Sequence, residues 1–190
     1  MNEIEKRIFQ NPYTYNPKEL AECLSKKYKT VGLTVFRGDD RDDSIIKSQG
    51  FSPWNIMPKE NLIGLIADLI SDEKFRKVFW AWWKYPANRT INEKNNPFVS
   101  TGTECGHKGT YEYKIELNDF NMYEISKGIL YFQVGFNGDN LENSSIIAIQ
   151  IDMHEVIFGT NIPGKFNHRI YNQLLLNVLR VISQKYGHNL

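Results

Sequence analysis

The first half of the chain is patterned mainly for helices. Apolar residues recur at helical spacing through 61–85, where they form a broad apolar face, so this segment predicts a long helical region. Two shorter helices are predicted at 16–28, which begins with an Asn-Pro-x-Glu sequence, and at 43–48, which is ended by Gly50. Residues 31–36 are mostly apolar and predict a buried strand between them.

From Pro97 onward the pattern changes to short strands, separated by clusters of Gly, Asn and Asp. A last helix is predicted at 173–186. Because helices come early and strands late, with no βαβ alternation, the pattern indicates the α+β class. Neither a repeat nor a linker divides the chain, so we expect a single domain over 1–190. The strands are predicted at 98–101, 110–117, 129–136, 146–151 and 155–158.

The tryptophans 80, 82 and 83 are clustered at the end of the long helical region. Two interpretations are open for them. They pack into a core or form a helical lid, or they form a platform on which a nucleic-acid base stacks. Packing is the more common use of such a cluster, and we favour it.

The composition is that of a folded, soluble domain. The chain has 190 residues, 13% of them aromatic, and a formal net charge of +1, which argues against a protein that coats nucleic acid. Its cysteines, Cys23 and Cys105, have no zinc-binding spacing and are expected to be free thiols. The charged N-terminus does not resemble a signal peptide, and Asp68 interrupts the longest apolar stretch, so we expect no membrane span.

A candidate site begins at the end of the strand predicted at 31–36. Arg37 follows an apolar run, where a guanidinium needs an anionic partner. Its planar fork suits a diphosphate or a carboxylate. Asp39 and Arg41 follow in the next turn, so a purely structural salt bridge between Arg37 and Asp39 is an open alternative.

The continuation of this motif resembles a known family. From Phe36 to Trp54 the chain has an aromatic residue, Arg-x-Asp-x-Arg, a short Ile-containing helix, Gly50 and a hydrophobic-x-Pro-Trp turn. This order resembles the catalytic chains of bacterial-toxin mono-ADP-ribosyltransferases of the cholera toxin, heat-labile enterotoxin and pertussis toxin type. The resemblance extends, in ordered motifs, to about Tyr171.

The second motif lies at 96–102, whose Phe-Val-Ser-Thr-Gly sequence resembles the family's aromatic-Val-Ser-Thr-Ser strand. The resemblance implies that Ser100 hydrogen-bonds a catalytic carboxylate and that Thr101 packs beneath it. Gly102 departs from the family, which has a second Ser there. On its own, this motif would favour a plain strand end.

The third motif is a glutamate, for which Glu155 is the best candidate. Its spacing to Ile162-Pro163 matches that from the catalytic Glu to Ile-Pro in the family, and 170–171 resembles the Ile-Tyr that follows in cholera toxin. The other glutamates considered are Glu112, Glu116, Glu124 and Glu142.

The resemblance implies a split antiparallel β-sheet ADP-ribosyltransferase core with N-terminal and peripheral helices. It also implies an enzyme that cleaves the nicotinamide–ribose bond of NAD⁺ and transfers ADP-ribose to a macromolecular acceptor. Glu155 would stabilise the cationic sugar, Ser100 would hold Glu155, and Arg37 would bind a phosphate or ribose. The residues expected to bind NAD are Phe36, Arg37, Gly38, Asp39, Arg41, Trp54, Ser100 and Thr101.

The same resemblance implies partners and a location. NAD is the co-substrate and no metal is required. The acceptor is expected to be a protein of a target cell, which the protein reaches by secretion or delivery without a visible signal peptide. A delivery or binding subunit is compatible with this family.

Three departures leave alternatives open. Met153 stands where the family has Glu or Gln to position the acceptor, Gly102 replaces a Ser, and no histidine lies between Arg37 and Ser100. Asp152 or His154 could replace the missing acceptor residue. The alternatives are an inactive binding module of the same fold, an NAD glycohydrolase, and an unrelated hydrolase that uses His154 or His168 with Glu155.

Overall fold

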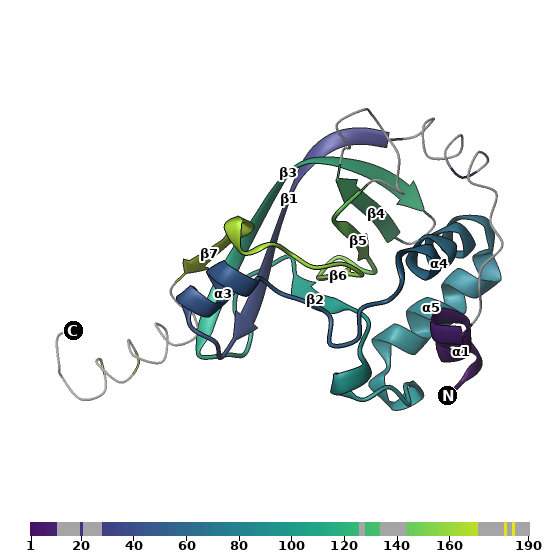
Figure 1. The fold of residues 1–190 in the computed structure, drawn as a ribbon, viewed down its shortest axis with the longest axis horizontal. Helices are drawn as coiled ribbons and strands as arrows, with labels where there is room; N and C mark the ends of the chain where they lie inside the picture. Colours follow the sequence, from purple (N-terminus) through teal and green to yellow (C-terminus); the bar gives the residue numbers. More distant parts are fainter. Residues whose placement is uncertain are drawn as a thin grey trace.

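The computed structural model describes residues 1–10, 20, 28–125, 128–133, 144–170, 181 and 184. The helices predicted at 16–28 and 173–186 fall almost entirely outside the described residues, and so do Cys23 and Tyr171. The rest of the fold can be followed in Figure 1, from the N-terminal helix to the last strand.

Six antiparallel strands form a closed barrel in the order β1-β2-β6-β5-β4-β3, and β3 pairs back to β1. The split-sheet ADP-ribosyltransferase core implied by the motifs is therefore wrong: the sheet is a closed barrel with four helices. A seventh strand pairs with the first part of β3, while β4 pairs with the last part of β3. The strands are β1 (Tyr28–Asp39), β2 (Val99–Gly102), β3 (Tyr111–Ile125), β4 (Gly128–Gln133), β5 (Ile147–Gln150), β6 (Glu155–Phe158) and β7 (Asn167–Ile170).

β1 pairs with a strand on each of its two edges, and these two pairings, the seams of the barrel next to β1, differ greatly in length. It pairs with β3 along almost its whole length, from Tyr28↔Tyr123 to Asp39↔Tyr111. It pairs with β2 only at Phe36↔Gly102. The sequence predicted these strands but not this pairing, because strand periodicity says which face is buried and not which strands are neighbours.

The barrel interior is one hydrophobic cluster to which all six strands contribute. Val35, Val99, Tyr113, Tyr131, Ala148 and Val156 are examples, and each is at most 6% exposed. Side chains alternate along a strand, so the neighbouring residues face outward. The outward residues of β5 and β6, such as Ile149 and Ile157, belong to a second cluster shared with the helices.

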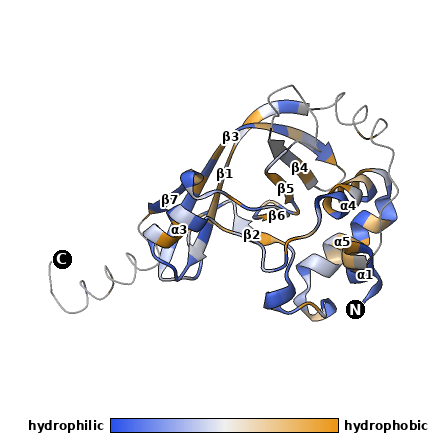
Figure 2. Ribbon diagram, in the orientation of Figure 1, coloured by the Kyte–Doolittle hydropathy of each residue, from blue (hydrophilic) through white to orange (hydrophobic). Residues whose placement is uncertain are grey.

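Helices α1 (Glu3–Gln10), α4 (Lys59–Ser71) and α5 (Glu73–Lys84) pack together and cover that outer wall (Figure 1). Figure 2 shows hydrophobic residues on α4, β5 and β6, where the two layers meet. Helix α3 (Asp43–Gln49) lies beside β7, away from the other helices. The 3₁₀ turns are η1 (Pro86–Asn88), η2 (Glu93–Asn95) and η4 (Gly164–Phe166).

Local signals explain where the helices begin and end. Asp42 Oδ1 accepts the Ser44 and Ile45 N–H groups at the start of α3, and Gly50 ends it with φ 68°. The long helical region predicted at 61–85 is divided at Asp72, whose side chain accepts the Phe75 N–H and starts α5. Trp82 and Trp83 are 3% and 4% exposed, so they pack in the helix core as favoured.

In the part of the chain that the structure describes, no helix is both long enough and apolar enough to cross a membrane.

Candidate functional site

A cleft of about 420 Å³ opens where the end of β1 meets β2 and the start of β6. The register brings these strands together, because Gly102 faces Phe36 on one side and Glu155 on the other. Arg37, Ser100 and Glu155, which lie far apart in the sequence, thus share one cleft. Its lining residues are Arg37, Gly38, Ser100, Thr101, Gly102, His107, Lys108, His154 and Glu155.

Glu155 is held both at its side chain and at its backbone. Ser100 Oγ donates a hydrogen bond of 2.6 Å to its Oε1. The backbone N–H of Glu155 is bonded to Asp152 Oδ1 at 2.8 Å, which fixes the turn before β6. Thr101 donates to the Val156 carbonyl at 2.8 Å and so ties β2 to β6 beneath the cleft.

Arg37 closes the weak seam between β1 and β2. Its Nη1 donates to the Ser100 carbonyl at 2.5 Å, and its guanidinium lies 5.3 Å from the Phe51 ring centroid. Burial lowers the pKa of Arg37, and the negative charge of Asp39 opposes that shift. Its Nε is buried and makes no hydrogen bond to any residue that the structure describes.

Asp39 is bound mainly to Arg41 rather than to Arg37. Its carboxylate accepts two hydrogen bonds from the Arg41 guanidinium, at 2.8 and 2.9 Å, whereas Arg37 Nε is 3.9 Å away. Burial alone would raise the pKa of Asp39, but the bonds from Arg41 hold it below its ordinary value. Asp39 therefore neutralises Arg41 more directly than it neutralises Arg37.

Four of the expected NAD-binding residues, Phe36, Asp39, Arg41 and Trp54, are not among the residues that line the cleft. Trp54 is 72% exposed, in the turn after α3. Phe36 is half-buried and faces Gly102 in the register, on the opposite side of β1 from Arg37. The Arg41 guanidinium lies over Phe51, 5.5 Å from the ring centroid, and stabilises the turn through its bonds to Asp39.

His107 and Lys108 line the cleft, and the sequence did not predict them. They lie in the β2–β3 loop, where Glu112 Oε1 accepts the Gly106 and His107 N–H groups at 2.5 and 3.0 Å. This loop crosses β1 so closely that a Cβ at Gly38 would lie 1.9 Å from the Lys108 carbonyl oxygen. The glycines of this loop were the sequence signal that could have located it. Gly106 and Gly109 have φ of 108° and 148°, values that favour glycine.

Gly102 is explained by His107. A Cβ at Gly102 would lie 2.2 Å from His107 Nε2 and 2.3 Å from Cε1. The serine that the family has at this position would therefore collide with the imidazole. The departure from the motif makes room for a histidine that reaches the cleft from another segment.

Of the three residues before Glu155, only His154 lines the cleft. Met153 is 77% exposed, and Asp152 Oδ1 is occupied by the N–H groups of His154 and Glu155, at 2.7 and 2.8 Å. His154 lines the cleft but is mostly exposed, with Glu104 3.9 Å from its Nδ1. His168 lies on β7 with Glu116 4.0 Å away, and it does not line this cleft.

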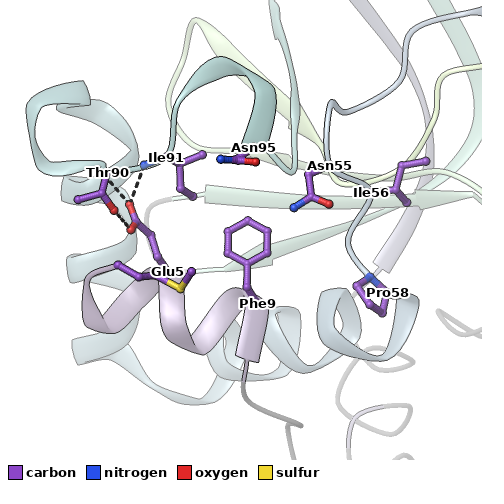
Figure 3. A pocket seen from close by; sticks show the side chains of 9 residues that line it. Glu5, Phe9, Asn55, Ile56, Pro58, Thr90, Ile91 and Asn95 are labelled. Carbon is purple, nitrogen blue, oxygen red and sulfur yellow. Dashed lines mark hydrogen bonds between the residues drawn. The ribbon is translucent and has the colours of Figure 1, made fainter.

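Further cavities lie beside the helices. One, of about 720 Å³, is lined by α1 and by the segments around Asn55 and Thr90 (Figure 3). Another, of about 440 Å³, lies at the end of α5 around Arg89, and a third, of about 310 Å³, lies between α1 and the start of α5. Among the residues that the structure describes, no three His, Cys, Asp or Glu side chains come together as a metal site.

The chain matches no protein-family model, and no curated protein sequence is significantly similar to it. Its function must therefore be argued from the chemistry of the cleft, since a fold alone does not imply a function.

Proposed function

We propose that the protein is an NAD⁺-dependent mono-ADP-ribosyltransferase, with its reaction centre in the Arg37–Ser100–Glu155 cleft. The observation that carries the proposal is the single carboxylate of Glu155, held by Ser100 Oγ at 2.6 Å in a cleft that also contains the guanidinium of Arg37. The three motifs were chosen from sequence order alone, and their key side chains line one cleft.

Cleavage of the nicotinamide–ribose bond builds positive charge on the sugar, as in glycoside hydrolysis. The bond breaks with its electron pair passing to the pyridinium nitrogen, so nicotinamide leaves neutral. Glu155 stabilises the cationic C1′ carbon by its negative charge, and Ser100 fixes the direction in which that charge points. An acceptor oxygen or nitrogen then forms the new bond to C1′.

Arg37 and Lys108 supply the positive charge that a dinucleotide needs. The side chain of Arg37 is 30% exposed and lines the cleft, so its positive charge can attract a phosphate oxygen. Lys108 is exposed on the opposite wall and adds a second cation. We further propose that the protein is secreted or delivered and modifies a macromolecule of a target cell.

The test is a Glu155→Gln variant, which keeps the shape of the side chain and removes its charge. We expect nicotinamide release from NAD⁺ to fall by about a hundredfold or more, the order of effect seen when transition-state electrostatics are lost. The matched control is Glu116→Gln, an exposed carboxylate on β3 outside the cleft. Unchanged release in a folded Glu155→Gln protein would place the reaction elsewhere.

A further inference from the structure

The cavity at the end of α5 contains the guanidinium of Arg89. The Arg89 guanidinium stacks over Trp83, with its central carbon 4.7 Å from the ring centroid. Among the residues that the structure describes, no carboxylate forms a salt bridge with it. The cavity measures about 440 Å³, and its lining residues are Trp82, Trp83, Pro86, Arg89, Ile91, Asn92, Asn96 and Pro97.

Helix α1 holds the segment that follows Arg89. The carboxylate of Glu5 accepts hydrogen bonds from the Thr90 N–H at 2.7 Å, the Ile91 N–H at 3.3 Å and the Thr90 hydroxyl (Figure 3). Glu5 is 1% exposed, and Trp82 Nε1 donates a further hydrogen bond of 3.3 Å to its carboxylate. The backbone on the C-terminal side of Arg89 is thereby fixed before any ligand binds.

The Arg89 cavity lies on the same face of the barrel wall as the carboxylate of Glu155. Trp83 packs edge-on against Phe98 at 5.2 Å, and both belong to the cluster that contains Ile157. Since side chains two apart on a strand share a face, Glu155 projects on the side of Ile157. Burial lowers the pKa of Arg89, and the negative charge of Glu155 opposes that shift, so the two groups interact.

The charge in this cavity favours one class of acceptor. A guanidinium beside Asn92 and Asn96 attracts an anion and repels an arginine side chain. A neutral or cationic acceptor must also lose a proton as it attacks, which needs a base. Met153 cannot act as one, and Asp152 Oδ1 is occupied by backbone N–H groups. His107 Nε2 is buried, and the imidazole of His154 lies beside the carboxylate of Glu104. An anionic oxygen needs no base.

We infer that the Arg89 cavity binds the acceptor and that the acceptor is a carboxylate side chain, Asp or Glu, of another protein. The inference rests on the function proposed above. A carboxylate oxygen forms a bond to ribose C1′ as the C1′–nitrogen bond to nicotinamide breaks, giving an ester and neutral nicotinamide. No proton is exchanged. The net charge of +1 and the lack of a basic block favour a protein over a nucleic acid as the carrier of the anion.

The test follows the linkage that the protein makes. The full chain is incubated with NAD⁺ labelled in its adenosine and with a cell lysate, while nicotinamide release is measured in parallel. We expect label on protein that neutral hydroxylamine removes, because hydroxylamine cleaves esters. Label that resists hydroxylamine, label that nuclease removes, or nicotinamide release without labelled protein would each overturn the inference while leaving NAD⁺ cleavage intact. Absence of nicotinamide release would instead reject the proposed function.

An Arg89→Gln variant tests the cavity itself. We expect transfer to protein to fall at least about tenfold more than nicotinamide release falls, the effect of losing one charge-assisted hydrogen bond. Arg89→Lys, which keeps the charge, should retain more transfer than Arg89→Gln. The matched control is Lys84→Gln, which removes an exposed charge in the last turn of α5 and should change neither quantity. An equal fall in both activities in Arg89→Gln would exclude the acceptor role.

Discussion

At the scale of single residues, the groups that form the cleft each bind more than one neighbour. Ser100 is the clearest case, because its hydroxyl donates to Glu155 while its carbonyl accepts from Arg37. One residue therefore relates the carboxylate and the guanidinium to each other. The distance between the Glu155 carboxylate and the Arg37 guanidinium is therefore set by the position of β2, to which both are bonded.

Replacing Arg37 tests the assignment of the dinucleotide to this cleft. We expect Arg37→Ala to weaken NAD⁺ binding by about ten- to a hundredfold, since hydrogen bonds to charged groups contribute about 1.5–3 kcal/mol. Isothermal titration calorimetry measures this, with Lys47→Ala on α3 as a control for lost positive charge. Equal affinity in Arg37→Ala and the unaltered protein would remove Arg37 from the binding site.

Introducing a serine at position 102 tests the role of His107. The new Cβ would displace the imidazole, so we expect Gly102→Ser to lower the free energy of unfolding by about 1 kcal/mol, at the low end of overpacking costs. In a His107→Ala background the same change should cost less, because the colliding ring is gone. Urea unfolding of the four proteins gives the coupling energy. A cost that is the same in both backgrounds would contradict the packing explanation.

At the scale of elements, α1 and the segment 89–91 form one unit, although more than eighty residues separate them in the sequence. Burial alone would raise the pKa of Glu5, but the hydrogen bonds from Thr90, Asn2 and Trp82 hold it below its ordinary value of 4.5. The folded state thus favours the ionised carboxylate. Glu5 is the group through which α1 stabilises the rim of the Arg89 cavity.

This lowered pKa gives stability a pH dependence of known sign. The contribution of Glu5 is fully present above pH 4.5 and is lost as the pH falls through the lower value in the folded state. We expect Glu5→Gln to lower the free energy of unfolding at pH 6.5 by about 1–3 kcal/mol, the cost of an unsatisfied buried group. At pH 3 the two proteins should differ less. A difference that is equal at both pH values would show that Glu5 is not ionised in the fold.

The sequence predicted the elements better than their arrangement. The strands at 98–101 and 155–158 and the helix at 43–48 are confirmed, because each has a clear periodicity or cap. α1 was not predicted, although Asn2 and Glu5 form a reciprocal capping box at its start. β7 is a four-residue polar strand and was not predicted either. The β1–β3 pairing that closes the barrel joins distant segments, and no local pattern encodes which strand a given strand will meet.

The residues of the candidate site likewise divide into those that the sequence predicted and those that it did not. Arg37, Ser100 and Glu155 could be chosen because their neighbours in sequence form motifs. His107, Lys108 and Arg89 could not, because they reach the site through a loop crossing and a helix end. Gly102 carried indirect information, since the missing side chain marks the space that His107 fills.

At the scale of the whole molecule, the barrel has one strong and one weak seam. The backbone pairing of β1 with β3 is extensive, whereas β1 and β2 share the single pair Phe36↔Gly102. Local opening should follow this difference, since amides exchange at the free energy of the smallest opening that exposes them.

Hydrogen exchange measures the two seams directly. We expect the β1 amides that point toward β3 to exchange at least about tenfold more slowly than the β2 amides that point toward β1. Arg37→Ala should speed exchange in β2 further, because its Nη1 bond to the Ser100 carbonyl is lost. Uniform protection around the barrel would mean that side chains in the cleft seal the weak seam as firmly as a full ladder does.

The dual use of Arg37 has an evolutionary consequence. The same guanidinium fastens the barrel wall through the Ser100 carbonyl and, in the function proposed here, grips the substrate. Any mutation at this position is thus exposed to selection twice, once through folding and once through turnover. A descendant that abandoned catalysis would still be under pressure to keep the arginine, so its survival in distant relatives would not by itself reveal which of them are enzymes.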